Sequence, residues 1–479
     1  MKINTGNTYY DNERNLFIDF LDVYVLPGVK NGNDRWQIGE MIELIVNPGC
    51  DQRCKYCYIT NHGKELYPIE RRAKDKQVYL DNLQAIFNLL TQKKIHINRW
   101  EIFGGDLFHN GVIFDLFEAF YNYYVELQDE LAGFEADFSG MITEIVIPNN
   151  MSYFQNDEIF NRVVEWRNKL IDIKVIVGFS YSTDGKYAVD SREQKPLSDE
   201  YWDDQFRKAK AIEAGFHPMV SPENIETWIE NYDWWLEMYK KHNLDDHPRN
   251  FQPPILEVRN DGWTDEKIES YLYLLRHIFL KRMEMCDNDI EKMAYHYFKG
   301  NEEKRTDVLP HSGTMDPILL YPNDNKFKLE RATCSIQELL HIDLADLSVV
   351  PCHRLSYEVF RAGKFVVEDG VINDFIPHNV TAYLAIHTTN VNLTPDCPGC
   401  VHNVACGRGC MGAQYEYIGE PFINIPSVCN LLKAKHNFVI KMLNETGVLQ
   451  KALDYNYLTK DQREYYVDIS KRMGYNING

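Results

Sequence analysis

The chain has 479 residues, of which 44% are hydrophobic, and it carries a formal net charge of −20. This apolar fraction excludes wholesale disorder and is enough for a large buried core. The acidic balance argues against general nucleic-acid binding, because contacts with phosphates need a basic surface, and it disfavours docking on an anionic membrane. No apolar run approaches the roughly 20 residues that a membrane helix needs.

The predicted elements begin after an N-terminal extension, residues 1–40, which shows no clear periodicity. From residue 41 to residue 285, strand-like apolar runs alternate with segments whose apolar residues recur three and four apart. The strand-like runs are Met41–Asn47, Ile97–Phe103, Ile142–Ile147, Ile173–Ser180, Phe216–Val220 and Ile255–Arg259. Six strand–helix units in series predict an α/β fold with parallel strands and helical crossovers, in an open sheet or a barrel.

The rest of the chain divides into three parts. Residues 296–331 are polar and turn-rich, as expected of a bridge between domains, so the α/β domain is placed at residues 41–295. A cysteine-rich domain is predicted at residues 332–440, and a helical tail at residues 441–479. Chemistry in parallel α/β folds gathers at the carboxyl ends of the strands, and the first cysteines directly follow the first predicted strand.

The cysteines are clustered, which indicates metal or redox chemistry. The first residues of the chain lack the apolar core of a signal peptide, so we expect a cytoplasmic protein, in which disulfides are rare. Of eleven cysteines, three lie within Cys50–Cys57, seven within Cys334–Cys429, and Cys286 stands alone. Packing does not explain this distribution, and metal binding does.

The first cluster has the spacing CxxxCxxC, formed by Cys50, Cys54 and Cys57. Three thiolates this close can hold three irons of a four-iron cluster and leave the fourth iron without a protein ligand. That open iron can chelate the amino and carboxylate groups of S-adenosylmethionine (SAM). The alternative is a zinc site, which needs four ligands and could recruit His62 as the fourth.

This spacing resembles the radical SAM superfamily, whose CxxxCxΦC motif has an aromatic residue at Φ, here Tyr56. The resemblance implies a partial TIM-type barrel of six βα units, in which reductive cleavage of SAM yields a 5′-deoxyadenosyl radical that abstracts hydrogen. It also implies that Tyr56 lies near the adenine of SAM, and that an external electron donor such as flavodoxin or ferredoxin supplies the electron.

Two further segments resemble SAM-binding segments of the family. Gly104-Gly105-Asp106 follows the second predicted strand, where the family has Gly-Gly-Glu, although here Asp replaces Glu and no proline follows. The resemblance implies that this loop meets the methionine amine. Ser182, in Ser182-Thr183-Asp184-Gly185, corresponds to a serine that helps to bind the SAM carboxylate; an ordinary Thr-Asp-Gly turn is the alternative.

The second cluster has the pattern CxxC–x5–C–x3–C…C, formed by Cys397, Cys400, Cys406, Cys410 and Cys429, with Cys334 and Cys352 upstream. This pattern resembles the SPASM domain, an auxiliary iron–sulfur domain that follows the barrel in many radical SAM enzymes. Seven thiolates can serve two [4Fe-4S] clusters, so the resemblance implies three clusters in all. The ligands of the outer auxiliary cluster would be Cys397, Cys400, Cys406 and Cys429. Those of the inner one would be Cys334, Cys352 and Cys410, with the fourth ligand unassigned. Cys286 is one candidate for it, and a free buried thiol is the other interpretation of that residue. Structural zinc ribbons are the alternative for the whole region.

His353 follows Cys352 at the place where sulfatase-maturing relatives have a basic carboxylate, and this departure argues against simple sulfatase maturation. His353 is therefore a candidate proton acceptor, or a histidine that merely donates a hydrogen bond near a cluster.

The resemblance implies an oxidoreductase that modifies a ribosomally made peptide or a protein, for example by a thioether or carbon–carbon crosslink or by oxidation. Two alternatives stay open. One is a radical SAM dehydrogenase or mutase that acts on a small molecule. The other is a non-catalytic iron–sulfur or zinc protein with an electron-transfer or binding role.

Overall fold

The structure is a computed structural model, which describes residues 2–4, 9–11, 37–46, 49–50, 52–135, 143–181, 183–187, 197–243, 255–299, 318, 320, 340–388, 394–403, 405–406 and 409–477. The chain forms two compact units, and each is composed of several stretches of sequence. Unit 1 comprises Met1–Ser182, Arg207–Gly215 and Ile336–Thr388, and unit 2 comprises Thr183–Phe206, Phe216–Ser335 and Thr389–Gly479. The cysteine-rich region is thus divided between the two units.

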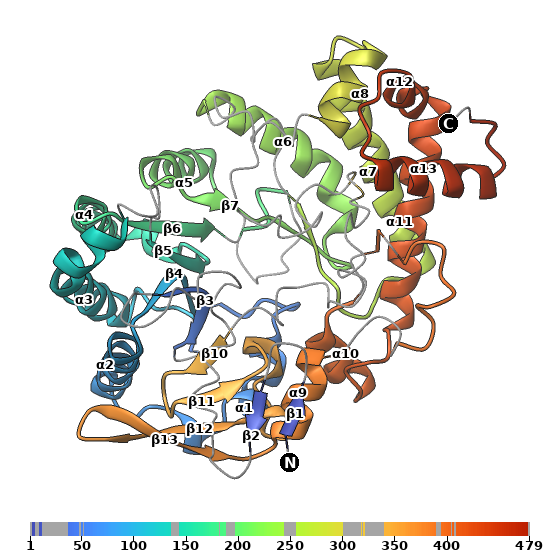
Figure 1. Cartoon of the computed structure of the whole chain (residues 1–479). Helices are drawn as coiled ribbons and strands as arrows, with labels where there is room; N and C mark the ends of the chain where they lie inside the picture. Colours follow the sequence, from blue (N-terminus) through green and yellow to red (C-terminus); the bar gives the residue numbers. More distant parts are fainter. Residues whose placement is uncertain are drawn as a thin grey trace. The chain divides into compact units, whose positions relative to one another are not determined.

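The centre of unit 1 is an open, mostly parallel sheet (Figure 1). Its parallel strands in spatial order are β3 (Gln37–Ile45), β4 (Ile95–Phe103), β5 (Thr143–Asn149) and β6 (Val175–Tyr181), and the short β7 (Gly215–Phe216) follows β6. Each of these strands overlaps a run that the sequence predicted as a strand. The predicted α/β class and its parallel strands are therefore confirmed, and the sheet does not close.

The sheet continues on the other side of β3, through strands that come from the far end of the chain. β10 (Leu340–Asp343) pairs parallel with β3, and β11 (Ser348–Val350), β12 (Gly363–Glu368) and β13 (Val371–Pro377) follow as an antiparallel meander. This register places His341 opposite Glu43 and makes residues 340–377 part of the same sheet as β3–β6. A separate small sheet pairs β1 (Lys2–Asn4) with β2 (Tyr9–Asp11).

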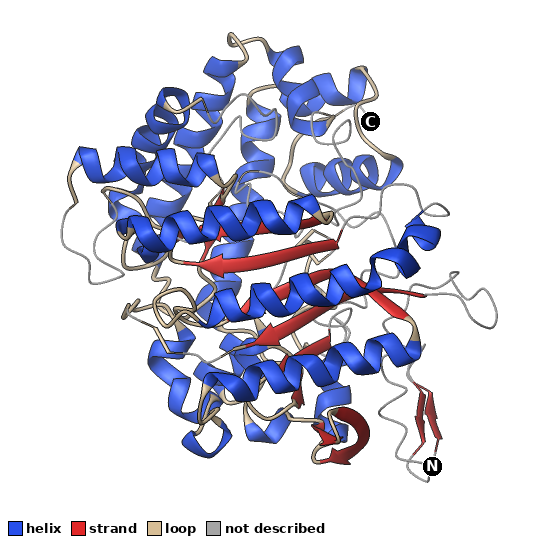
Figure 2. Cartoon of the chain, turned by 90° about the vertical axis from the view of Figure 1, so that its left-hand side faces the viewer, coloured by secondary structure: helices blue, strands red, loops and turns tan. Residues whose placement is uncertain are grey.

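Helices cover one face of this sheet. Figure 2 is turned so that α2 (Lys76–Lys93), α3 (Val112–Glu135) and α4 (Asp157–Asp172) face the viewer, and they run alongside the strands. Their apolar residues pack with Trp100 of β4: Phe87 of α2 and Phe120 of α3 lie edge-on to its ring at 5.7 and 5.2 Å between centroids. The Trp100 indole donates a hydrogen bond of 2.8 Å to Tyr124, so its polar atom is satisfied in the core. Short helices α1 (Tyr58–Leu66) and α9 (Val380–Thr388) complete this unit.

Unit 2 is predominantly helical. It contains α6 (Trp228–Lys241), α7 (Asp265–Met285), α8 (Ile290–Phe298), α10 (Met411–Ile418), α11 (Pro426–Glu445), α12 (Val448–Asp454) and α13 (Lys460–Arg472). Helix α11 packs against α7, α12 and α13, and α8 packs against α12. Helix α5 (Asp199–Ala211) spans the boundary between the two units.

The fifth predicted strand is interrupted. In place of one run, Phe216–Val220, the structure has β7 and, in unit 2, β8 (Met219–Val220), which pairs parallel with β9 (Leu256–Glu257). Pro218 lies between β7 and β8, and proline has no N–H with which to continue a ladder. None of the helices in the described ranges is long and apolar enough to cross a membrane.

A buried ion pair fastens α11 within unit 2. The Lys435 ammonium lies 2.9 and 3.1 Å from the two carboxylate oxygens of Glu257 on β9, and the side chains are 4% and 2% exposed. Tyr271 donates a hydrogen bond to the same carboxylate. Burial raises the pKa of Glu257, but Lys435, Arg259 and the Tyr271 hydrogen bond together more than offset this effect. The pKa of Glu257 therefore lies below its ordinary value.

We expect Lys435→Met to lower the free energy of unfolding by about 3–5 kcal/mol, because it leaves a buried carboxylate without its cation. Anaerobic urea denaturation followed by circular dichroism measures this loss. The contribution of the pair should be present above the unfolded pKa of about 4.3 and should disappear as the pH falls below it. The exposed Lys441 supplies a control: if Lys441→Met is as damaging, the buried pair is not the cause.

Candidate functional site

The three cysteines of the first cluster lie on the loop that joins β3 to α1, at the carboxyl end of β3. The Cys57 amide donates a hydrogen bond of 3.0 Å to the Cys54 carbonyl, which closes the loop into a tight turn. Cys57 is the N-cap of α1, so it lies at the end of the helix where free backbone N–H groups favour anionic ligands. All three side chains are partly exposed. This turn, with accessible sulfurs and a helix N-terminus, fits a three-thiolate cluster site.

A side chain from the end of β5 contacts one of these sulfurs. The Asn150 amide nitrogen lies 3.8 Å from the Cys50 sulfur, while its oxygen accepts a hydrogen bond from the Ser152 amide. The donor group of Asn150 is therefore held toward the cysteine. Hydrogen bonds to ligand sulfurs tune iron–sulfur clusters, so Asn150 joins the candidate site, although the sequence alone gave no signal for it.

The Gly104-Gly105-Asp106 segment packs directly against the cysteine loop. The Asp106 amide donates a hydrogen bond of 2.7 Å to the Gly49 carbonyl. A side chain at Gly105 would place its Cβ only 1.8 Å from the Gly49 oxygen and 2.9 Å from the Cys50 nitrogen. Only glycine allows this approach, so Gly105 fixes the position of the cysteine loop relative to the end of β4.

The Asp106 carboxylate is engaged in the loop that it belongs to. One oxygen accepts hydrogen bonds from the Phe108 and His109 amides at 3.0 and 3.2 Å, and the other lies 3.3 Å from the Ser152 hydroxyl. The side chain is 6% exposed. These contacts shape the turn after β4 and already supply the carboxylate with partners.

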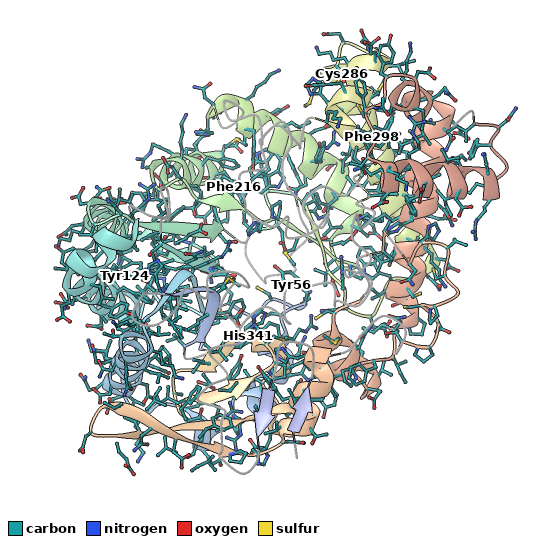
Figure 3. The ribbon with its side chains drawn as sticks, in the orientation of Figure 1. Tyr56, Tyr124, Phe216, Cys286, Phe298 and His341 are labelled. Carbon is teal, nitrogen blue, oxygen red and sulfur yellow. The ribbon has the colours of Figure 1, made fainter. Side chains whose placement is uncertain are left out.

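The other two predicted SAM contacts are Ser182 and Tyr56. Ser182 lies outside the described residues. The Thr183–Gly185 turn that follows it is held within unit 2 by Asn231 of α6, whose amide donates to the Asp184 carbonyl and whose oxygen accepts from the Tyr187 amide. Figure 3 shows the side chain of Tyr56, which is half-buried on the cysteine loop of unit 1.

A row of ionisable groups crosses the face of the unit 1 sheet that α2–α4 do not cover. The pairing register places His341 of β10, Glu43 of β3 and Glu101 of β4 side by side on neighbouring strands. His341 and Glu43 are 2% and 3% exposed, and 3.8 Å separates the His341 Nε2 from a Glu43 oxygen. The sequence alone does not single out this row, because β3 and β4 contain other polar residues, such as Glu40 and Arg99.

His353 lies over this row. Its Nδ1 is 2.9 and 3.0 Å from the two oxygens of Glu43, and its ring stacks on Phe103 with 3.9 Å between centroids and 5° between planes. The Tyr67 hydroxyl donates a hydrogen bond of 2.8 Å to the His353 carbonyl. Glu43 therefore fixes the side of the imidazole that carries a proton, and Phe103 fixes the plane of the ring.

The pKa values of this row are coupled through charge. Burial lowers the pKa of His353, but the negative charges of Glu43 and Glu101 more than offset this effect. The pKa of His353 therefore lies above its usual value. Burial raises the pKa of Glu43, and His353 and His341 more than offset that effect. For Glu101, burial and the neighbouring Glu43 raise the pKa to about 7. The row can thus hold a proton close to neutral pH.

The four cysteines assigned to the outer cluster lie close together in unit 2. Cys397, Cys400, Cys406 and Cys429 line one pocket, which we call the outer cysteine pocket, together with residues that include Asp396, Asn424 and Lys433. Four thiols around one cavity fit a four-thiolate cluster, as they would fit zinc. No disulfide involves the cysteines that the structure describes.

The cysteines assigned to the inner cluster belong to different units of the chain. Cys352 belongs to unit 1, where it precedes the short helical turn His353–Leu355, and Cys410 belongs to unit 2 as the N-cap of α10. Cys334 lies outside the described residues. Cys286 is 4% exposed at the end of α7, and burial raises the pKa of its thiol, as expected of an inert buried cysteine.

No family model and no curated protein matches this sequence. Among solved structures, the chain is similar to native anSMEcpe with bound AdoMet and Cp18Cys peptide, with 13% identity and a TM-score of 0.48 over 86% of this chain and 99% of that one. It is also similar to Streptococcus suis SuiB bound to precursor peptide SuiA, with 14% identity and a TM-score of 0.46 over 81% of this chain and 75% of that one. At this level of likeness, the function of the chain is argued from its own residues.

The close approach at Gly105 leads to a test of the loop geometry. We expect Gly105→Ala to cost about 1–3 kcal/mol or more, because the added methyl meets backbone that must move. Thermal unfolding of the two proteins side by side measures the loss. Gly63→Ala in α1 is the matched control, since its Cβ would meet only Ile59 at an ordinary 3.6 Å. Equal midpoints for Gly105→Ala and the parent protein would show that the two loops are not in contact.

Proposed function

We propose that this chain is a radical SAM enzyme that modifies a peptide or protein substrate after translation. One observation carries the proposal: the Cys50–Cys57 loop lies at the carboxyl end of a parallel strand and is held against the Gly104–Gly105 turn at the end of the next strand. Parallel α/β folds bind their ligands at this end of the sheet. The combination of spacing, loop and glycine turn favours a cluster that binds SAM over a closed zinc site.

The cluster, when bound, supplies the electron that cleaves SAM into methionine and a 5′-deoxyadenosyl radical. Cys50, Cys54 and Cys57 would hold it, and Asn150 would donate to the Cys50 sulfur. Gly105 keeps the turn after β4 against the cysteine loop, and Asp106 shapes that turn through the Phe108 and His109 amides. Tyr56 and Ser182 remain the proposed contacts of the adenine and the carboxylate.

The second cysteine set favours substrate chemistry beyond hydrogen abstraction. Auxiliary clusters in the outer cysteine pocket and at Cys352, Cys410 and Cys334 would take an electron from a substrate radical or bind a substrate thiolate. His353, oriented by Glu43, is the proposed proton acceptor. A dehydrogenase or mutase that acts on a small molecule is the second candidate function, since the same residues would serve it.

The experiment that tests the substrate class is mass spectrometry of candidate precursor peptides that are co-expressed with the enzyme. A mass change in a peptide that depends on the intact Cys50–Cys57 loop supports peptide modification. Deoxyadenosine formation that no peptide increases, together with conversion of a small metabolite, would contradict it and favour the second candidate.

Replacement of Cys50, Cys54 and Cys57 by alanine should abolish reductive SAM cleavage and leave the absorbance of the other clusters. We expect about 12 irons per chain in the reconstituted parent protein and about 8 in the triple variant, because each cluster holds four. Iron analysis and quantification of 5′-deoxyadenosine check both values. A colourless protein with zinc and no iron would rule out the proposal.

The contacts of Asp106 lead to a separate expectation for its side chain. Asp106→Asn retains an oxygen for the Phe108 and His109 amides but removes the negative charge. If the carboxylate also meets the SAM amine, SAM binding should weaken by about 1–3 kcal/mol, the scale of a charge-assisted hydrogen bond. Isothermal titration with SAM measures this. Unchanged affinity would leave Asp106 with its role in the turn alone.

A further inference from the structure

Two hydrogen-bond donors from separate segments of unit 2 line the outer cysteine pocket. The first donor is Asn424, whose amide nitrogen lies 3.4 Å from the Cys397 sulfur. Its amide oxygen accepts a hydrogen bond of 3.0 Å from the buried Gln414 of α10. Because Gln414 occupies the oxygen, the NH₂ group of Asn424 must face the sulfur.

The second donor is Lys433, which lies one helical turn after Cys429 on α11. Residues four apart share one face of a helix, and both residues line the pocket. The Lys433 side chain is exposed, and an exposed lysine is charged at neutral pH, so a positive charge lies beside the sulfurs. Asp396 also lines the pocket and offsets part of that charge.

We propose that Asn424 and Lys433 stabilise the reduced form of an iron–sulfur cluster held in the outer cysteine pocket and thereby raise its reduction potential. This inference rests on the proposed function, because it needs iron in the pocket. Reduction adds one negative charge to the cluster, and donors or cations at the ligand sulfurs favour the more negative state. In this arrangement Asn424 donates to the Cys397 sulfur, and Lys433 lies on the same face of α11 as Cys429.

The test is an anaerobic redox titration followed by electron paramagnetic resonance, in the full chain with Cys50, Cys54 and Cys57 replaced by alanine. That background removes the SAM-binding cluster, and the signal that Cys429→Ala abolishes identifies the outer one. At fixed potential, Asn424→Leu should lower the ratio of reduced to oxidised cluster about fivefold, the scale of one hydrogen bond. Lys433→Gln should lower the ratio about tenfold at low salt, which corresponds to 59 mV for one electron.

Two features separate this inference from general loss of packing. Tyr466→Phe removes a buried hydroxyl of α13 that donates to the Leu320 carbonyl, and Lys441→Gln removes an exposed cation farther along α11, so both should leave the potential unchanged. Because Lys433 is exposed and charged, its effect should shrink as salt rises, whereas that of the neutral, half-buried Asn424 should not.

The outcomes are distinguishable. Lower potentials for Asn424→Leu and Lys433→Gln with unchanged controls support the inference. Potentials equal to that of the background protein, or equal shifts in the controls, overturn it and leave the proposed function intact. A pocket that holds zinc and gives no signal overturns the proposed function itself.

Discussion

The parallel register of β3 with its two neighbours is the constraint on which the unit 1 site depends. On one side, β4 aligns Glu101 with Glu43 and brings the Gly104–Gly105 turn to the same sheet end as the cysteine loop. On the other side, β10 aligns His341 with Glu43. Because side chains alternate along a strand, a slip of one residue would turn Glu43 into the helix-covered core. The same pairing therefore determines both the cluster loop and the acid–histidine row.

The sequence predicted those parts of the fold that depend on local pattern. Apolar runs predicted β3–β6, and helical spacing predicted helices between them, because residues buried on one face recur at a fixed spacing in the sequence. The cysteine loop was predictable for the same reason, since its three thiols lie within eight residues. Pro218 could have warned that the fifth strand would break, because proline cannot continue a ladder.

What the sequence could not predict depends on pairing between distant segments. Nothing local indicates that residues 340–377 extend the sheet of β3, since that requires the register of β10 against β3. The orientation of His353 by Glu43 follows from that register. The contact of Asn424 with the Cys397 sulfur is likewise a result of the fold, because 27 residues separate the two, and it leaves no motif. Asp106 was predicted as a SAM contact from its position, whereas its local hydrogen bonds became visible only in the fold.

The central claim is that the Cys50–Cys57 loop holds a cluster whose open iron binds SAM. The most direct measurement is electron paramagnetic resonance of the reduced, iron-reconstituted protein with and without SAM. The account predicts that SAM changes the spectrum of one cluster and leaves those of the auxiliary clusters as they were. A spectrum that SAM does not alter, in protein with its full iron content, would contradict it.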